Sequence, residues 1–222
     1  PESVLGVVTD VSDPRQVADL NAATLETFGK VDLLVNNAVS RIGRGIDADL
    51  AEWRRAMEIN LWGPILGVRQ FLAALLENPG PSCVVNVGSK QGITNPPGNY
   101  AYNLSKAGVK NYTESLAHAL RSQPECEITA HLLVPGFTYT GMIAKFVPEK
   151  PPAAWTAAQA VDFMLDALGR NDFYILCPDN ETPRELDEKR IQWNADDLIK
   201  NRSALSRWDE AYKDAYEQFM AD

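Results

Sequence analysis

The sequence predicts an α/β fold in which a doubly wound parallel sheet forms the middle of three layers. Its strand-like runs are apolar along their whole length, which is typical of strands buried on both faces. They alternate with segments of helical periodicity, which favours parallel strands joined by helices. A chain of 222 residues is long enough for one such domain with a substantial core. We assign residues 1–178 to this domain and the charge-rich, helical residues 179–222 to a C-terminal extension.

The first elements expected are a strand, a helix and a second strand. Val4–Asp10 is an apolar run rich in β-branched residues, so it predicts a buried strand. A helix begins at residues 12–14, where a serine or an aspartate can cap it and Pro14 takes the first position. Gly29 ends that helix, and Val31–Asn36 predicts the second buried strand.

The rest of the domain continues the alternation. A long helix opens at Asp47–Glu52 and runs to Leu76, before the breaker Pro79-Gly80-Pro81. A second long helix runs over Tyr102–Leu120, and Thr156 caps a third. The strands expected between and after these helices are Cys83–Val87, Ile128–Val134 and Phe173–Cys177.

The C-terminal extension predicts an amphipathic arm. Ser206-Arg-Trp-Asp209 has the form of a capping box that would start a helix. Trp208, Tyr212, Ala215 and Phe219 then fall near one face of that helix. We expect the arm to pack on the domain or on a partner subunit.

Composition narrows the classes of partner. The net charge of -9 argues against a nucleic-acid partner, because phosphate backbones are bound by clustered lysine and arginine. The apolar stretches are too short for a membrane span, and no signal peptide is visible. Cys83, Cys126 and Cys177 are scattered, which favours a reduced, cytoplasmic protein.

Several chemistries lack their residues. His118 and His131 lie inside a predicted helix and a predicted strand with no ligand spacing around them, so no metal site is expected. Gly88-Ser-Lys-Gln-Gly92 places serine directly after glycine and is not the nucleophile elbow of hydrolases. No phosphate-binding P-loop is present.

Tyr102 and Lys106 are the strongest candidates for catalysis. They are four residues apart, so they lie on one face of a helix. The ammonium favours the phenolate, which suits a tyrosine for general acid–base work. Ser89, thirteen positions upstream, can hydrogen-bond a reacting carbonyl or carbinol oxygen. A hydride, which no side chain supplies, would have to come from a nicotinamide.

Five motifs, in order and at matching spacing, resemble the short-chain dehydrogenase/reductase (SDR) family. Each is weak alone, since YxxxK often arises by chance, but five on matching elements are specific. The resemblance covers about residues 3–178. The motifs are Asn36-Asn37-Ala38, Asn60 within Glu58–Leu61, Val85–Ser89, Tyr102 with Lys106, and Pro135-Gly136 followed by Thr140.

The resemblance implies a Rossmann-like fold and an NAD(P)-dependent oxidoreductase that interconverts an alcohol and a ketone. Tyr102 would be the acid/base, Lys106 its electrostatic partner and the anchor of the cofactor ribose, and Ser89 the partner of the substrate oxygen. Asn60 would hold a water that relays protons past Lys106, although an asparagine within a helix also marks a kink.

The implied cofactor is NAD or NADP, with no residue to discriminate between them. By analogy Asp10 faces the adenine, or else it caps the next helix. Thr140 contacts the cofactor or caps the segment after it, and Asn36 is structural in either case. The implied cofactor-binding residues are Asp10, Asn36, Ala38, Tyr102, Lys106, Pro135, Gly136 and Thr140.

The resemblance also bears on substrate and assembly. Met142, Phe146 and Trp155 fall in the family's substrate-lid region and suggest an apolar substrate, or they are plain core. In the family the helices corresponding to Asp49–Leu76 and Tyr102–Leu120 pair across a dimer axis, which implies a homodimer or homotetramer.

The family's opening strand, glycine-rich turn, helix, strand and helix have no counterpart in the sequence, so the domain is expected to be truncated at its N-terminus. Val4–Asp10 corresponds to the family's third strand, whose neighbours in the 3-2-1-4-5-6 order are missing. We expect it to pair in parallel with Leu33–Asn36, or across a subunit boundary. Loss of the turn removes hydrogen bonds to the pyrophosphate that amount to about a thousandfold to a millionfold in affinity. Val39, where the family usually has glycine, crowds the site further.

Two alternatives follow from that loss. One is a cofactor-independent lyase or isomerase that uses Tyr102 and Lys106 for proton transfer. The other is a non-catalytic scaffold that dimerises through the two long helices.

Overall fold

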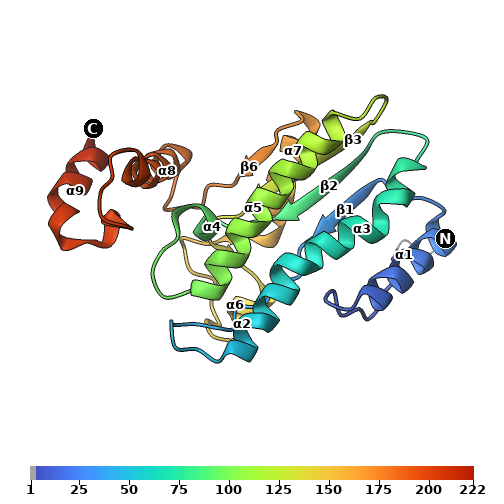
Figure 1. Ribbon diagram of the computed structural model, residues 1–222, viewed down its shortest axis with the longest axis horizontal. Helices are drawn as coiled ribbons and strands as arrows, with labels where there is room; N and C mark the ends of the chain where they lie inside the picture. The colour runs from blue at the N-terminus through green and yellow to red at the C-terminus, as the bar shows by residue number, and fades with distance from the viewer. Residues whose placement is uncertain (1–3) are drawn as a thin grey trace.

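The computed structural model describes residues 4–222 and confirms the predicted α/β fold. Its centre is a four-stranded parallel sheet with the order β1-β2-β3-β6 (Figure 1). Every neighbouring pair is non-consecutive or joined through a helix, as parallel pairing requires. The strands are β1 (Leu33–Asn36), β2 (Ser82–Val87), β3 (Ile128–Val134) and β6 (Tyr174–Leu176).

Helices cover the two faces of the sheet unequally. Successive side chains of a strand point to opposite faces. Val84 belongs to a core cluster beneath α1 (Pro14–Phe28), α3 (Gly63–Leu76) and α5 (Tyr100–Arg121). Val85 belongs to a second cluster beneath α7 (Ala157–Gly169) on the other face (Figure 1). The catalytic candidates therefore stand on a core that is packed from both sides at β2 and β3.

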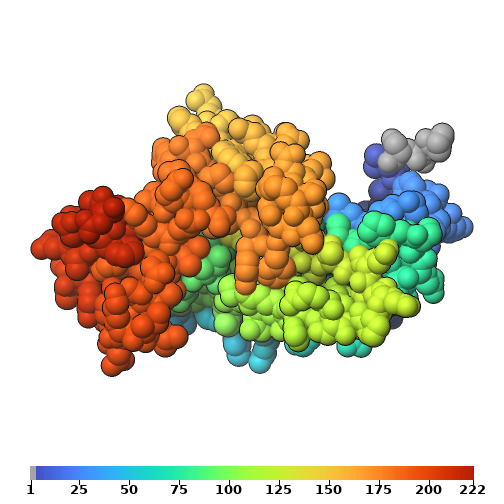
Figure 2. All heavy atoms as spheres, turned by 90° about the horizontal axis from the view of Figure 1, so that it is seen from above, coloured from blue at the N-terminus to red at the C-terminus, as the bar shows by residue number. Residues whose placement is uncertain are grey.

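Val4–Asp10 is not a strand, and its predicted pairing with β1 is wrong. The segment carries no strand assignment, and the side chains of Val4 and Val8 are 76% and 101% exposed. Asp10 instead accepts hydrogen bonds from Ser12 and from Arg55 of α2 (Leu50–Met57), which hold the chain at the start of α1. In the part of the chain that the structure describes, β1 is therefore an edge strand of the sheet. Figure 2 shows the blue N-terminal segment at one end of the molecule and the red C-terminal arm at the other.

The first helix follows its predicted signals. Asp13 caps α1 by accepting from the backbone N–H of Arg15, and Pro14 is its first residue. Gly29 ends it with a φ of 78°, a left-handed conformation that glycine adopts without strain.

The long second helix contains a π-helical turn. Asp49 caps α2, residues Glu58–Trp62 widen into the π turn, and α3 continues to Leu76. By length and a mean hydropathy of 1.3, Leu50–Leu76 is the one helical stretch among residues 4–222 that would suffice to cross a membrane. The sequence alone suggested that no apolar stretch is long enough. In the fold, Val68, Phe71 and Leu75 of this stretch are buried in the core under the sheet.

Short elements complete the domain. They include α4 (Gln91–Thr94), α6 (Gly141–Ala144) and a two-stranded parallel pair of β4 (Thr138–Tyr139) and β5 (Trp155–Thr156). Thr156 caps α7 as predicted, in a full capping box with Gln159.

The C-terminal arm packs chiefly on itself. It comprises α8 (Arg184–Ile199), two short 3₁₀ turns (Ser206–Trp208 and Glu210–Tyr212) and α9 (Lys213–Ala221). The expected capping box at Ser206 is wrong: its hydroxyl is buried, accepts from the Trp193 indole and donates to Asp197. Trp193 makes ring contacts with Tyr216 and Phe219, which hold α9 against α8.

Candidate active site

Polar residues gather in a cleft at the carboxyl ends of the strands. Ligands of open parallel sheets bind at this edge, because the loops after successive strands converge there. The cleft has a volume of about 810 Å³, within the range of about 300–1,000 Å³ common for small-molecule sites. The structure places six predicted site residues in its lining: Ser89, Tyr102, Lys106, Pro135, Gly136 and Thr140.

Tyr102 and Lys106 project from the first turns of α5. The Lys106 ammonium nitrogen lies 5.9 Å from the centroid of the Tyr102 ring. Lys106 is only 3% exposed, and its Nζ donates to the carbonyl of Val87 at 2.6 Å. Burial lowers the pKa of Lys106 to about 8, because desolvation disfavours its charged form. The lysine is thus held rigidly beside the phenol with a depressed pKa.

Ser89 is held by the turn that links β2 to α4. Its Oγ accepts from the backbone N–H of Gln91 at 3.2 Å, which leaves the hydroxyl proton to donate into the cleft. A Cβ at Gly92 would lie 2.5 Å from the backbone carbon of Lys106, so only glycine lets α4 approach α5 this closely. This close packing fixes Ser89 relative to the tyrosine helix.

Asn60 connects two segments behind the cleft through hydrogen bonds. Its side chain is fully buried in the π-helical turn. The amide oxygen accepts from Ser40 N at 2.6 Å, and the amide nitrogen donates to Ser40 O at 2.8 Å and to Ser105 Oγ at 3.1 Å. These bonds tie the loop after β1 to α5. The amide faces those partners and does not line the cleft, so the predicted proton relay remains a prediction.

Asn36 and Ala38 lie away from the cleft. Asn36 donates to Asn86 at 2.8 Å, and Asn86 donates to Thr113 of α5 at 3.0 Å. This chain of amides crosses from β1 to α5, which is the structural role expected for Asn36. Ala38 lines a separate apolar groove of about 180 Å³ between α1, β1 and α3.

Asp10 is also outside the cleft. It accepts from the backbone N–H and hydroxyl of Ser12 and from the Arg55 guanidinium at 2.8 Å. The Ser12 hydrogen bonds and then Arg55 lower the pKa of Asp10 to about 2. Asp13, not Asp10, caps α1.

One feature of the cleft, the position of Arg41, was not predicted from the sequence. The Arg41 guanidinium carbon lies 5.2 Å from the Tyr102 ring centroid, so a second cation flanks the phenol. Arg41 belongs to no motif, and only its place in the loop after β1 hinted at the site. Thr140 lines the cleft, and its side chain makes no capping bond to α6.

The three residues predicted to lie over the substrate, Met142, Phe146 and Trp155, occupy different environments. Met142 lines the cleft, together with Val161 and Met164 of α7. Phe146 is 83% exposed and is not among the cleft residues. Trp155 packs edge-on against Phe163 in the core beneath α7.

Known proteins are similar to this chain in sequence. The short chain dehydrogenase family matches residues 1–151. A putative ketoacyl reductase of Streptomyces coelicolor is 37% identical over 63% of this chain and 53% of its own length. The CLA biosynthesis dehydrogenase/reductase of Lactiplantibacillus plantarum is 30% identical over 63% of this chain and 49% of its own length.

Solved structures agree. A short chain dehydrogenase/reductase from Burkholderia phymatum in complex with NAD superposes with a TM-score of 0.78, at 29% identity, over 90% of this chain and 78% of that chain. The chain spans about half the length of the curated relatives it matches. The family match over residues 1–151, the parallel sheet and the Tyr102–Lys106 pair lead to one conclusion: the chain belongs to the short-chain dehydrogenase family.

Proposed function

We propose that this protein is an NAD(P)-dependent oxidoreductase that interconverts an alcohol and a ketone in the cleft. The observation that carries the proposal is the burial of Lys106 beside Tyr102 in the same cleft that Ser89 lines. A phenol flanked by cations, with a hydroxyl donor in the same cleft, suits proton transfer to a carbonyl oxygen.

Each side chain has a separate task in the reduction direction. Ser89 Oγ donates a hydrogen bond to the carbonyl oxygen and orients it. Tyr102 gives its phenolic proton to that oxygen, and Lys106 and Arg41 stabilise the phenolate that remains. The nicotinamide, when bound, supplies the hydride. In the oxidation direction Tyr102 takes the proton back.

The cleft fits the nicotinamide half of a dinucleotide better than the adenosine half. Lys106, Pro135-Gly136 and Thr140 line the space beside Tyr102, where the ring and its ribose would lie. No glycine-rich turn stands beside β1 in the described residues, so backbone N–H donors for the pyrophosphate are lacking there. We therefore propose weak NAD or NADP binding by these 222 residues.

The substrate we propose is apolar. Met142, Val161 and Met164 line the cleft, and its wall is formed largely by side chains that offer no hydrogen bonds. The relative in Streptomyces coelicolor is named as a putative ketoacyl reductase, which agrees with a ketone on an apolar chain.

We also propose assembly as a homodimer, and the exposed apolar side chains on the long helices support it. Leu50, Trp62 and Leu104 are 60%, 54% and 52% exposed, although they belong to the two helices that pair in the family. Light scattering during gel filtration is expected to give twice the chain mass of 24.5 kDa, or four times for a tetramer.

A second function, proton transfer without a cofactor, is favoured by the Tyr102–Lys106 pair, because it can move a proton without a hydride donor. One experiment separates the two. Incubation of an apolar ketone with NADH or NADPH is expected to consume the reduced nicotinamide. Deuterium entering the ketone from D₂O without any cofactor, and no nicotinamide oxidation, would support the lyase or isomerase instead. If neither nicotinamide oxidation nor deuterium incorporation is observed, a non-catalytic scaffold is the remaining function.

A further inference from the structure

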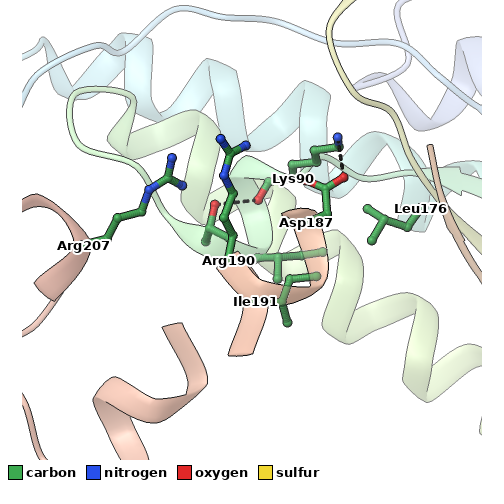
Figure 3. Close-up of a pocket in the computed structure, with 8 residues that line it drawn as sticks. Lys90, Leu176, Asp187, Arg190, Ile191 and Arg207 are labelled. Carbon is green, nitrogen blue, oxygen red and sulfur yellow. Dashed lines mark hydrogen bonds and ion pairs between the residues drawn. The ribbon is translucent and has the colours of Figure 1, made fainter. Parts of the chain in front are cut away.

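A small polar pocket lies on the opposite side of Ser89's turn, between the domain and the C-terminal arm. It has a volume of about 50 Å³ and is lined from α4, β6, α8 and the turn at Ser206–Trp208 (Figure 3). Lys90, which directly follows Ser89, lines both this pocket and the cleft. The pocket is therefore a near neighbour of the proposed active site but a separate cavity.

Three cations and one carboxylate line the pocket. Lys90 is paired: its Nζ lies 2.6 Å from Asp187 and 3.5 Å from Asp179. Arg190 and Arg207 have no carboxylate within 4.0 Å among residues 4–222. Figure 3 shows Arg190 between Arg207 on one side and the Lys90–Asp187 pair on the other. Neither guanidinium forms a direct ion pair with a described residue, although the charge of Arg190 acts on Asp187 across the pocket.

Both arginines are partly removed from water. The Nε of Arg190 is shielded from solvent and has no hydrogen-bond partner in the described part of the chain. Arg207 covers the rings of Trp208 and Tyr216 at 4.8 and 5.5 Å. Burial, and then the charge of Arg190, lower the pKa of Arg207, which agrees with two like charges held near each other. The shielded Nε–H of Arg190 lacks an acceptor among the described residues, and the charges of Arg190 and Arg207 repel each other. Both effects cost free energy unless an anionic acceptor binds between them.

We propose that Arg190 and Arg207 bind a small oxyanion of the phosphate class in this pocket. Guanidinium forks match the oxygens of phosphate with paired, charge-assisted hydrogen bonds. A water needs about 10–15 Å³ of such space, so 50 Å³ holds a group the size of about three to five waters. That suits a free phosphate or a terminal phosphate group and is too small for a dinucleotide. The Asp187 carboxylate in the wall is paired with Lys90, which it shares with Asp179.

The site would couple the arm to the domain. Arg190 comes from α8 and Arg207 from the turn before α9, whereas Lys90 and Thr94 belong to the segment that carries Ser89. A bound oxyanion adds a polar bridge between these segments without entering the cleft. The inference does not depend on the proposed dehydrogenase activity.

The test is calorimetric titration of the whole chain with sodium phosphate, with ionic strength held constant by sodium chloride. We expect one phosphate per chain. R190Q and R207Q each remove a charge-assisted hydrogen bond and are expected to weaken binding by about tenfold or more. R184Q is the matched control, because Arg184 lies on the same helix, is exposed and pairs with Glu188. Its affinity is expected to equal that of the wild type.

Each other outcome overturns the proposal. Phosphate heat that persists in the R190Q/R207Q double variant places the binding elsewhere, for example in the cleft. Equal heats with chloride show screening only, and acetate binding as tightly as phosphate shows a carboxylate site. If R190Q fails to fold by circular dichroism, R190K keeps the charge but loses the fork, and unchanged phosphate affinity in R190K contradicts the inference. NADH is not expected to compete.

Discussion

β3 and β1 have similarly apolar sequences but very different surroundings. Leu132 and Val134 of β3 are 0% and 1% exposed, whereas Leu33 and Val35 of β1 are 38% and 39% exposed. β3 has a strand on each side and helices on both faces, but among residues 4–222 β1 pairs with β2 alone. The difference teaches that an apolar run predicts the capacity for burial, and that its neighbours decide whether burial occurs.

The difference between the enclosed and the open half of the sheet also separates the two parts of the proposed function, proton transfer and cofactor binding. The proton-transfer groups stand on the enclosed half, where α4, α5 and β2 pack closely around Lys106. The adenosine half of a dinucleotide would lie over the open half, beside the bare β1 edge. We therefore expect chemistry to depend on well-fixed residues and cofactor affinity to be the weaker property.

The largest expected effect is that of Y102F on catalysis. Removing the phenolic proton donor is expected to lower the rate of ketone reduction by about 100- to 10,000-fold. Tyr100, 42% exposed on the same helix, gives the matched control Y100F, which is expected to retain its rate. The measurement is turnover at saturating cofactor, and a Y102F rate within threefold of the wild type would contradict the role of Tyr102.

Burial of Lys106 predicts a pH-dependent stability. Its pKa is lowered from 10.5 to about 8 in the fold, so the unfolded chain binds more protons between these values. Stability is therefore expected to rise with pH from about 8 to about 10.5, by on the order of 3 kcal/mol, and the full penalty applies below pH 8. Urea unfolding of wild type and K106M across this range measures it. A constant difference between the two proteins at every pH would contradict the depressed pKa.

A matched pair of valines tests the two halves of the sheet directly. V85A leaves a cavity in the enclosed core and is expected to cost about 2 kcal/mol or more of unfolding free energy. V35A, at the register partner of Val85 on β1, is expected to cost about 0.5 kcal/mol or less. Urea midpoints compare them. Equal losses would mean that β1 is covered in solution, as by a partner at its edge.

The smallest effect is expected at the N-terminal turn. The pKa of Asp10 is lowered from 3.8 to about 2, so its contribution to stability is present above pH 3.8 and is lost as pH falls toward 2. D10N removes that dependence, and its acid-unfolding curve is expected to be slightly flatter than that of the wild type. D19N, at an exposed position of α1, serves as the control. Identical curves for D10N and the wild type would show that the Ser12 and Arg55 bonds do not form.

Local signals predicted local structure well. β3 runs over Ile128–Val134 as expected, and Thr156 caps α7, because side-chain period and capping act within a few residues. The strand predicted at Val4–Asp10 does not form, because a strand needs a pairing partner and the sequence pattern does not reveal whether one is present. The capping box predicted at Ser206 does not form, because the Trp193 indole donates a hydrogen bond to its hydroxyl inside the arm.

The site was predictable where motifs lie on adjoining strands. Ser89, Tyr102 and Lys106 meet because parallel strands bring their carboxyl ends to one edge. Arg41 and the Arg190–Arg207 pair carry no spacing signal, since loop and arm positions follow from tertiary packing alone. Asp10 and Ala38 were predicted to bind the cofactor by analogy with the family. In the structure Asp10 binds Arg55 and Ala38 lines a separate groove, so neither reaches the cleft.

The most direct test of the central claim is calorimetric titration of the 222-residue chain with NADH and, separately, NADPH. We predict weak binding to one site, in the millimolar range, that is lost in K106M, since Lys106 lines the proposed nicotinamide site. Binding that is unchanged in K106M, or no binding at any concentration, would contradict a nicotinamide site beside Tyr102.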